Sequence, residues 1–171
     1  MRPPVTSDPL SILLGHNRWA TGRVLDRCRA LSVAQFHQRF DIGPGSLHDT
    51  LVHIVDCMRW WADHVNARPP RPSIAPPPDR LSVEDLSRLL GEADAELHHL
   101  VEQSRAALDA TVHATFGDKR FTFTRGVALT HALVHGTHHR AQCLNMLRQL
   151  GVAPLPPSSV ADWTRLADAP A

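Results

Sequence analysis

Four long stretches of the chain repeat their apolar residues every three to four positions, and this repeat restricts the fold more than any other feature of the sequence. It is the repeat of α-helices that each bury one face. The stretches are residues 9–30, 46–66, 82–110 and 125–150. Amphipathic helices bury their apolar faces most simply against one another. The sequence therefore predicts an all-α protein built as a four-helix bundle.

The connections between these stretches carry signals of their own. Ser32 and Gln35 have the spacing of a capping box, which predicts a short helical turn after the first long helix. Residues 67–80 contain six prolines, a composition that excludes helix and predicts a long Pro-rich loop between the second and third long helices. Residues 112–124 alternate β-forming side chains around a Gly-Asp pair, which predicts a small hairpin before the fourth. We expect one more short helix at residues 160–166.

Length and composition limit the domain organisation and the partners. A chain of 171 residues, 43% of them hydrophobic, can bury one helical core. We predict a single domain over residues 1–171, with its core at about residues 8–151 and a Pro-rich tail at residues 152–171. The formal net charge of +1 gives no basic patch for nucleic acid or for an anionic membrane surface. No apolar run approaches the roughly 18 residues of a membrane helix, so we expect neither partner.

The cysteines and the first residues bear on where the protein works. Cys28, Cys57 and Cys143 each lie inside a predicted helix, and none belongs to a CxxC pair. This pattern is typical of buried, unpaired thiols. Residues 1–10 lack the apolar region of a secretion signal. We therefore expect a cytoplasmic protein with reduced thiols.

Histidine is unusually frequent, and its positions on the last long helix are informative. The chain has 12 histidines, of which four fall within residues 131–139. At about 100° per residue, His135 and His139 lie inside the apolar arc of the helix, one turn apart, so their rings can project to one point. His131 and His138 fall on the more polar edge. The HxxxH pair that we favour is His135 with His139.

Two polar residues on the other helices also lie near apolar faces. His53 borders the apolar arc of the second long helix, in line with Cys57, Trp60 and His64. Asn17 lies near the middle of the apolar arc of the first helix. A buried amide costs free energy unless it is hydrogen-bonded, so Asn17 needs a partner or a task.

Imidazoles from two helices have the chemistry of a metal site. Neutral imidazole binds zinc and its first-row neighbours well. Three such ligands leave a fourth tetrahedral position for water or substrate, as in catalytic sites. The HxxxH spacing by itself fits equally well with histidines that are hydrogen-bonded in the core or lie on a solvated face. A fourth protein ligand, such as His131 or a cysteine, would instead give a closed structural site.

Three stretches resemble one known family. They are HNRWATGRVL at residues 16–25, GSLHDTLVHIVDCMRWW at residues 45–61 and LTHALVHGTHHRAQCLNMLRQLG at residues 129–151. In this order they are similar to the DinB-like, damage-inducible proteins, the YfiT-like metalloenzymes. The resemblance implies a divalent-metal site formed by His53, His135 and His139, in agreement with the helical arcs. Ala141 stands where the family often has glycine.

The family also implies a range of activities. Its members are bundles of four long helices, often homodimers, with a nickel- or zinc-type ion; iron and manganese are the alternatives. Some transfer low-molecular-weight thiols such as mycothiol or bacillithiol, one branch isomerises maleylpyruvate, and others are proposed hydrolases. The resemblance therefore indicates a metal-dependent enzyme that activates a thiol or water to act on a small-molecule substrate. The competing hypothesis is a metal-stabilised bundle with a binding or stress-response role and no turnover.

Other residues have two interpretations each. Trp60 could form a wall of the metal pocket, although a core or dimer tryptophan is the more common case. Asn17 could hold a ligand histidine or a substrate, or else make a hydrogen bond to the backbone inside the bundle. We expect His131 and His138 to touch the ligand histidines or to lie at the surface. Asp56 and Arg140 could support the ligand histidines, but surface or interhelix ion pairs are expected for both.

Overall fold

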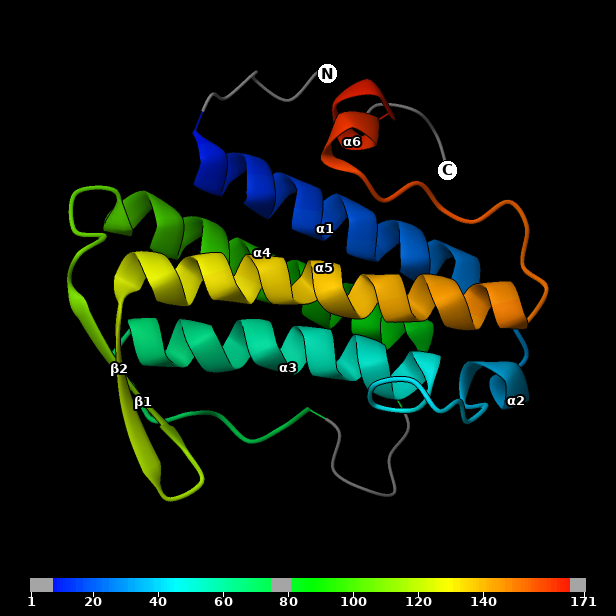
Figure 1. Ribbon diagram of the computed structural model, residues 1–171, viewed down its shortest axis with the longest axis horizontal. Helices are drawn as coiled ribbons and strands as arrows, with labels where there is room; N and C mark the ends of the chain where they lie inside the picture. Colours follow the sequence, from blue (N-terminus) through cyan, green and yellow to red (C-terminus); the bar gives the residue numbers. More distant parts are fainter. Residues whose placement is uncertain (1–7, 75–80, 167–171) are drawn as a thin grey trace.

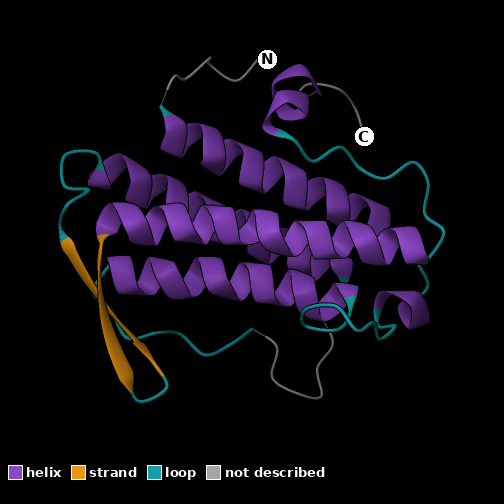
Figure 2. Cartoon of the chain, viewed as in Figure 1, coloured by secondary structure: helices purple, strands orange, loops and turns teal. Residues whose placement is uncertain are grey.

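The computed structural model describes residues 8–74 and 81–166, and its architecture is mostly helical. Four long helices lie side by side (Figure 1): α1 (Pro9–Cys28), α3 (Leu47–Val65), α4 (Val83–Ser104) and α5 (Arg125–Gln149). The other described elements are two short helices, α2 (Val33–Phe36) and α6 (Val160–Leu166), and the strands β1 (Thr111–Phe116) and β2 (Lys119–Thr124) (Figure 2). The prediction of a largely helical protein with a small hairpin is confirmed. Part of the predicted Pro-rich loop, residues 75–80, lies outside the described residues.

Each long helix begins at a side chain that accepts a hydrogen bond from a backbone N–H group, because the first turn leaves such donors without partners. These N-cap residues are Asp8, Ser46, Ser82 and Thr124. Ser82 also forms a capping box with Asp85. The capping box that the sequence predicts at the start of α2 is present as well. Local signals in the sequence therefore set where the helices begin.

The core lies where the four long helices meet. Helices α1 and α3 each pack against both α4 and α5. Leu14, Ile54, Leu97 and Met146, one from each helix, are at most 1% exposed. Burial of an aliphatic side chain stabilises a fold by about 1.5–3 kcal/mol. This packing fixes α3 beside α5, and these two helices carry the candidate site. Among the described helices, none is long and apolar enough to cross a membrane.

The hairpin packs one face on the helices. Its strands pair antiparallel across a two-residue turn at Gly117 and Asp118, where Gly117 has φ 62°. Glycine adopts this backbone conformation without strain. Val112 is buried, and Phe123 opposite it contacts Trp61 of α3, with ring centroids 5.5 Å apart. The alternation that predicted the hairpin is therefore the alternation between its packed and exposed faces.

Helix α4 ends at Ser104, whereas the sequence pattern predicts helix to residue 110. The carbonyl oxygens of Leu108 and Ala110 accept hydrogen bonds from the backbone of Gly126 and Arg125, both at 2.8 Å. These carbonyl oxygens therefore accept hydrogen bonds from the first residues of α5 and not from a further turn of α4. The competing contacts are distant in sequence, so helical periodicity could not reveal them.

The C-terminal segment contacts α1. A β-carbon at Gly15 would lie 2.6 Å from Cζ2 of Trp163 in α6, so only glycine allows this approach. The ring Nε2 of His16 and the carbonyl oxygen of Ser158 are 2.8 Å apart. The Pro-rich tail is therefore packed against the long helices as far as α6.

Candidate metal centre

Three histidines from the neighbouring helices α3 and α5 gather at one point. His53 comes from α3, and His135 and His139 are one turn apart on α5. The ring centroid of His53 is 4.8 Å from that of His135 and 4.5 Å from that of His139, and the last two are 4.3 Å apart. The fold thus brings together the three residues that the sequence singled out as metal ligands.

The nitrogen atoms of this histidine cluster fit a divalent ion. One ligand atom from each residue lies within 4.8 Å of the other two. His135 Nε2 and His139 Nε2 are 3.1 Å apart, close to the roughly 3.3 Å between two nitrogens that bind a tetrahedral zinc-type ion at about 2.0–2.1 Å. His135 Nδ1 is buried and has no hydrogen-bond partner within the described residues. Because imidazole suits zinc, nickel, copper and iron, the donor set and its spacing are suitable for a transition-metal ion.

Gln142 orients one of the three rings. Its Oε1 is 2.7 Å from His139 Nδ1, so this nitrogen donates and carries the ring proton. The lone pair of His139 is then on Nε2, which faces His135. The amide Nε2 of Gln142 is in turn 3.2 Å from His138 Nε2. Gln142 was not among the residues singled out from the sequence, although its position three residues after His139 on the same helix was the available signal.

Burial lowers the pKa of all three imidazoles, because loss of hydration disfavours the charged form. The effect is largest for His135, where burial and then the neighbouring histidines lower the pKa to about 3. The hydrogen bond to Gln142 raises the pKa of His139 again, but its pKa remains below the ordinary value. The cluster is therefore uncharged near pH 7, and the neutral imidazole is the form that binds metal.

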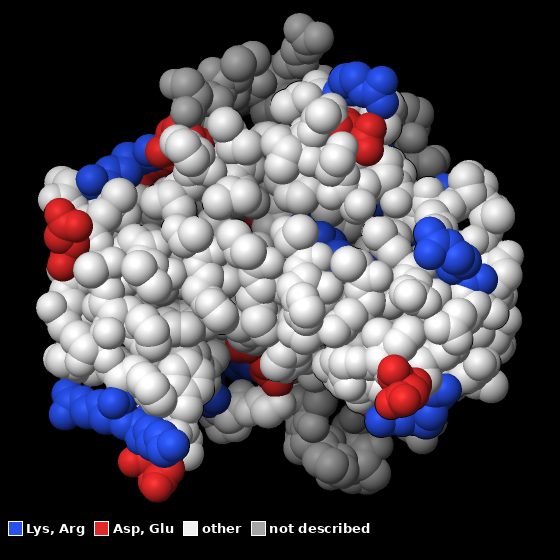
Figure 3. All heavy atoms as spheres, viewed as in Figure 1, with Lys and Arg blue, Asp and Glu red and all other residues white. Residues whose placement is uncertain are grey.

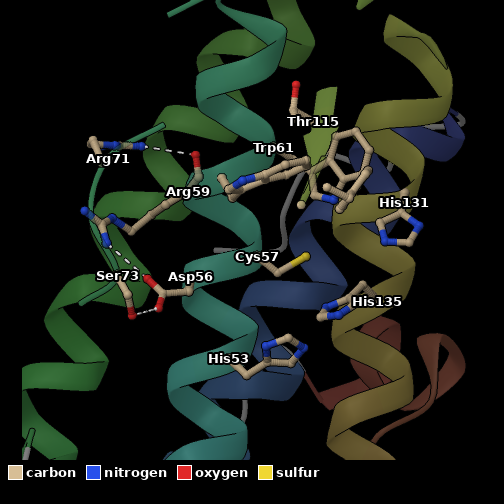
Figure 4. A pocket seen from close by; sticks show the side chains of 13 residues that line it. His53, Asp56, Cys57, Arg59, Trp61, Arg71, Ser73, Thr115, His131 and His135 are labelled. Atoms are coloured by element: carbon tan, nitrogen blue, oxygen red, sulfur yellow. Dashed lines mark hydrogen bonds and ion pairs between the residues drawn. The ribbon is translucent and has the colours of Figure 1, made fainter. Parts of the chain in front are cut away.

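A cavity of about 470 Å³ opens beside the cluster (Figure 4). Its walls come from α3, α5, the hairpin and the loop that follows α3. The lining residues are His53, Asp56, Cys57, Arg59, Trp60, Trp61, Arg71, Ser73, Thr115, Phe116, Gly117, His131 and His135. The volume is within the range of small-molecule sites. A molecule in this cavity would therefore lie against two of the three metal-binding candidates.

Several further residues named from the sequence line the cavity, whereas His138 does not. Trp60 and His131 both line it, and the His131 ring centroid is 5.6 Å from that of His135. His138 is exposed and contacts Gln142 rather than the cavity. Cys57 also lines the cavity, and burial raises the pKa of its thiol to about 12. Cys57 is thus an uncharged thiol near pH 7.

The loop after α3 forms one side of the cavity because two carboxylates of α3 hold it. Asp63 is 1% exposed and accepts hydrogen bonds from Arg68 Nε at 2.5 Å and from Arg71 N at 2.8 Å. Two turns earlier on the helix, Asp56 accepts from Ser73 Oγ at 2.5 Å (Figure 4). The loop is therefore anchored at two positions along α3.

Asn17 lies in a second polar cluster, between α1 and α5. The guanidinium of Arg140 is 2% exposed, and its Nη1 donates to Asn17 Oδ1 at 2.5 Å and to Thr21 Oγ1 at 3.2 Å. Its Nη2 donates to Thr137 Oγ1 at 2.8 Å. Gly136 makes room for this contact, because a β-carbon there would collide with Asn17 Oδ1. Asn17 therefore makes a hydrogen bond inside the bundle, but with the side chain of Arg140 rather than with the backbone as expected.

The two ion pairs expected from the sequence have different outcomes. Asp56 pairs with Arg59 at 3.2 Å, as expected. The expectation for Arg140 is wrong, because none of the carboxylates in residues 8–74 and 81–166 pairs with it. Hydroxyl and amide oxygens solvate its charge instead. Burial accordingly lowers the pKa of Arg140 to about 10.

Comparison with known proteins tests the resemblance seen in the sequence. A search of curated proteins finds no match to this chain. A sequence model of the DinB family matches residues 6–164, which is nearly the whole chain and includes all four long helices and the histidine cluster. On this match, the chain belongs to the DinB family.

Proposed function

We propose that this DinB-family protein holds one divalent metal ion with His53, His135 and His139 and uses it for catalysis in the adjoining cavity. The observation that carries the proposal is the position of three uncharged imidazoles, with ligand atoms within 4.8 Å of one another, at a cavity of about 470 Å³. Nickel or zinc is the ion that we propose, because the donor set consists of imidazole nitrogens. Iron and manganese are the alternatives.

An ion held there would supply Lewis acidity that lowers the pKa of a thiol or water molecule in contact with it. The residues of the chain would orient the ligands and admit the substrate. Gln142 fixes the orientation of His139, while His53 and His135 face the cavity that admits a small molecule. Asp56, a carboxylate in the cavity wall, is engaged by Arg59 and Ser73. We therefore propose a thiol or water nucleophile, in a thiol-dependent S-transferase with a low-molecular-weight thiol cosubstrate or in a hydrolase.

The competing proposal is a metal-stabilised bundle with a binding or stress-response role and no turnover. This proposal is favoured because the ligands come from two helices. An ion bound to both α3 and α5 would link two helices that are far apart in sequence. The cavity beside His53 and His135 favours the enzyme. A fourth protein ligand that closed the coordination shell would favour the bundle.

We also propose a setting for this site. We propose the four-helix bundle of the DinB type as a single domain over residues 1–171, with its core at about residues 8–151. We also propose a homodimer in the cytoplasm that acts on a small-molecule substrate. The packing of α1, α3, α4 and α5 supports the bundle, and three free cysteines support a reducing compartment.

Metal content per chain tests the site. The untagged protein should contain about one divalent ion per chain, and His53→Ala, His135→Ala and His139→Ala should each lose most of it. His138→Ala is the matched control, since His138 is exposed and one residue from a ligand. If His138→Ala lost the ion and His139→Ala kept it, the ligand assignment would be wrong.

Cobalt substitution separates the two functions. Cobalt(II) in an open site should change its visible absorption when a thiol such as cysteine or mycothiol is added. A spectrum that no thiol or other small anion alters would contradict the enzyme and favour the closed, structural site.

A further inference from the structure

We propose that the cavity binds a small molecule with a planar, uncharged apolar body, whose donor group is directed at His53 and His135. This inference rests on the proposed metal function and names the class of ligand for the same site. It is carried by three aromatic rings in the cavity wall and by the pairing of the charges around them.

The aromatic wall consists of Trp60 and Trp61 from α3 and Phe116 from β1, all of which line the cavity. The ring centroid of Trp60 is 5.0 Å from that of Trp61 and 4.7 Å from that of Phe116. The centroids of Trp61 and Phe116 are 6.2 Å apart. These distances are those of aromatic rings in contact. The three rings therefore form one continuous apolar surface rather than isolated contacts.

This wall lies next to the histidine cluster. The ring centroid of His131 is 5.1 Å from that of Trp61 and 5.6 Å from that of His135. Figure 4 shows Trp61 and His131 above His135 and His53 along the same two helices. A ligand whose body covers the aromatic wall can therefore extend a donor group to the histidines.

The arginines of the cavity do not require an anionic ligand, because carboxylates of the chain already pair with them. Arg59 pairs with Asp56 at 3.2 Å. Arg71 pairs with Asp63 at 3.0 Å and with Glu96 at 2.7 Å. With Arg68, which pairs with the same Asp63 and Glu96, three guanidinium groups face three carboxylates. An anionic ligand would have to displace these partners, whereas an uncharged body need not.

Phe116 supplies apolar surface that a ligand can cover. Its side chain is 45% exposed at the tip of the hairpin, although it contacts both tryptophans. Removing such apolar surface from water is favourable. A flat apolar body placed against Phe116 and Trp60 would gain this free energy, and a ligand without such a body would not.

A neutral dye tests the aromatic wall without any metal. N-phenyl-1-naphthylamine should bind the metal-free, full-length protein with a rise in dye fluorescence. Phe116→Ala and Trp60→Leu should each weaken this binding, by about 5-fold or more, through lost apolar contact. Val160→Ala is the control, because Val160 is similarly exposed, at 38%, lies on α6 and does not line the cavity. Thermal melts establish that each variant is folded.

Two hydroxamates test the combination of body and donor group in the zinc- or cobalt-loaded protein. Benzohydroxamate and acetohydroxamate carry the same chelating group, and only the first has an aromatic body. Benzohydroxamate should bind about 10-fold more tightly, because its ring covers more apolar surface. In Phe116→Ala and Trp60→Leu this preference should shrink to about 3-fold or less, and in Val160→Ala it should persist.

The dye and the hydroxamates together distinguish an error in the ligand class from an error in the proposed metal function. Equal binding of the two hydroxamates, or no binding of the dye to the native protein, would overturn the aromatic ligand class. Dye binding that depends on Phe116, with neither hydroxamate bound by the loaded protein, would support the aromatic wall and overturn the open metal position.

Discussion

At the scale of single residues, one amide decides which nitrogen of His139 faces the cluster. Gln142 Oε1 accepts the Nδ1 proton at 2.7 Å, which leaves the Nε2 lone pair toward His135. Partners of this kind fix the tautomer and orientation of metal-binding histidines. Gln142 is therefore part of the site without touching the ion that we propose.

Gln142→Ala should weaken metal binding by about 10-fold, because His139 would lose the contact that orients its ring. Competition with a chromophoric chelator measures the affinity. Gln149→Ala is the control, since Gln149 lies on the same helix and its amide donates to Asn145 rather than to a histidine. Equal affinities of native protein and Gln142→Ala would show that the amide has no such role.

Gly136 should be far more sensitive to substitution than another helical glycine. Gly136→Ala would force Asn17 away from the buried Arg140 and should lower the free energy of unfolding by about 1–3 kcal/mol. At Gly22, inside α1, the methyl group of an alanine would meet nothing within 4 Å. Gly22→Ala should therefore raise the free energy of unfolding, by up to about 1 kcal/mol. Urea denaturation measures both, and equal effects would contradict the packing at Gly136.

At the scale of elements, the loop after α3 depends on Asp63. Burial alone would raise the pKa of Asp63, but hydrogen bonds from Arg71 and Arg68 together lower it below its ordinary value. A carboxyl whose pKa is lower in the folded state stabilises the fold above its unfolded pKa of about 3.9. This contribution is lost as the pH falls through the folded pKa.

Asp63→Asn should therefore lower the free energy of unfolding by about 2 kcal/mol at pH 7, where the native carboxylate is charged and buried. The native protein and the variant should converge as the pH falls below about 4, because Asp63 is then increasingly protonated in both states. Asp109→Asn, at an exposed position, is the control. A difference that grew on acidification would contradict the assigned direction of the pKa.

The elements themselves could be predicted from sequence where the signal is local. Periodicity and N-cap residues such as Ser46 and Ser82 place the helices, and alternation places the hairpin. The same periodicity directs His135 and His139 to one side of α5. What the sequence could not supply are contacts between distant segments. The early end of α4 at Ser104 and the binding of Arg140 to α1 both depend on such contacts.

At the scale of the whole molecule, α5 presents an uncharged outer face. Between Arg125 and Arg148 its only charged residue is Arg140, which is buried. Val127 and Val134 on this helix are 52% and 48% exposed. In Figure 3 the surface over α5 shows few charged atoms, whereas most of the charged residues lie around the edge of the view. A surface of this kind supports the proposed homodimer.

Val134→Asp should convert the proposed dimer to a monomer, because it would place two unpaired charges in the interface. Sedimentation velocity at micromolar concentration measures this change. Val33→Asp is the control, since Val33 is 72% exposed on α2. A native protein that sediments as a monomer, or a Val134→Asp variant that stays dimeric, would count against this interface.

The division of the cavity between helices and connecting segments governs how such a protein can change its ligand. The histidines are carried by α3 and α5, whose positions the core fixes, whereas Thr115, Phe116 and Gly117 belong to the hairpin tip, and Arg71 and Ser73 to a loop. Connecting segments tolerate substitution and changes of length with little effect on the core. The shape of the cavity can therefore change through substitutions in two peripheral segments while the histidine cluster stays in place. The same separation makes the hairpin tip a suitable position for grafting new specificity.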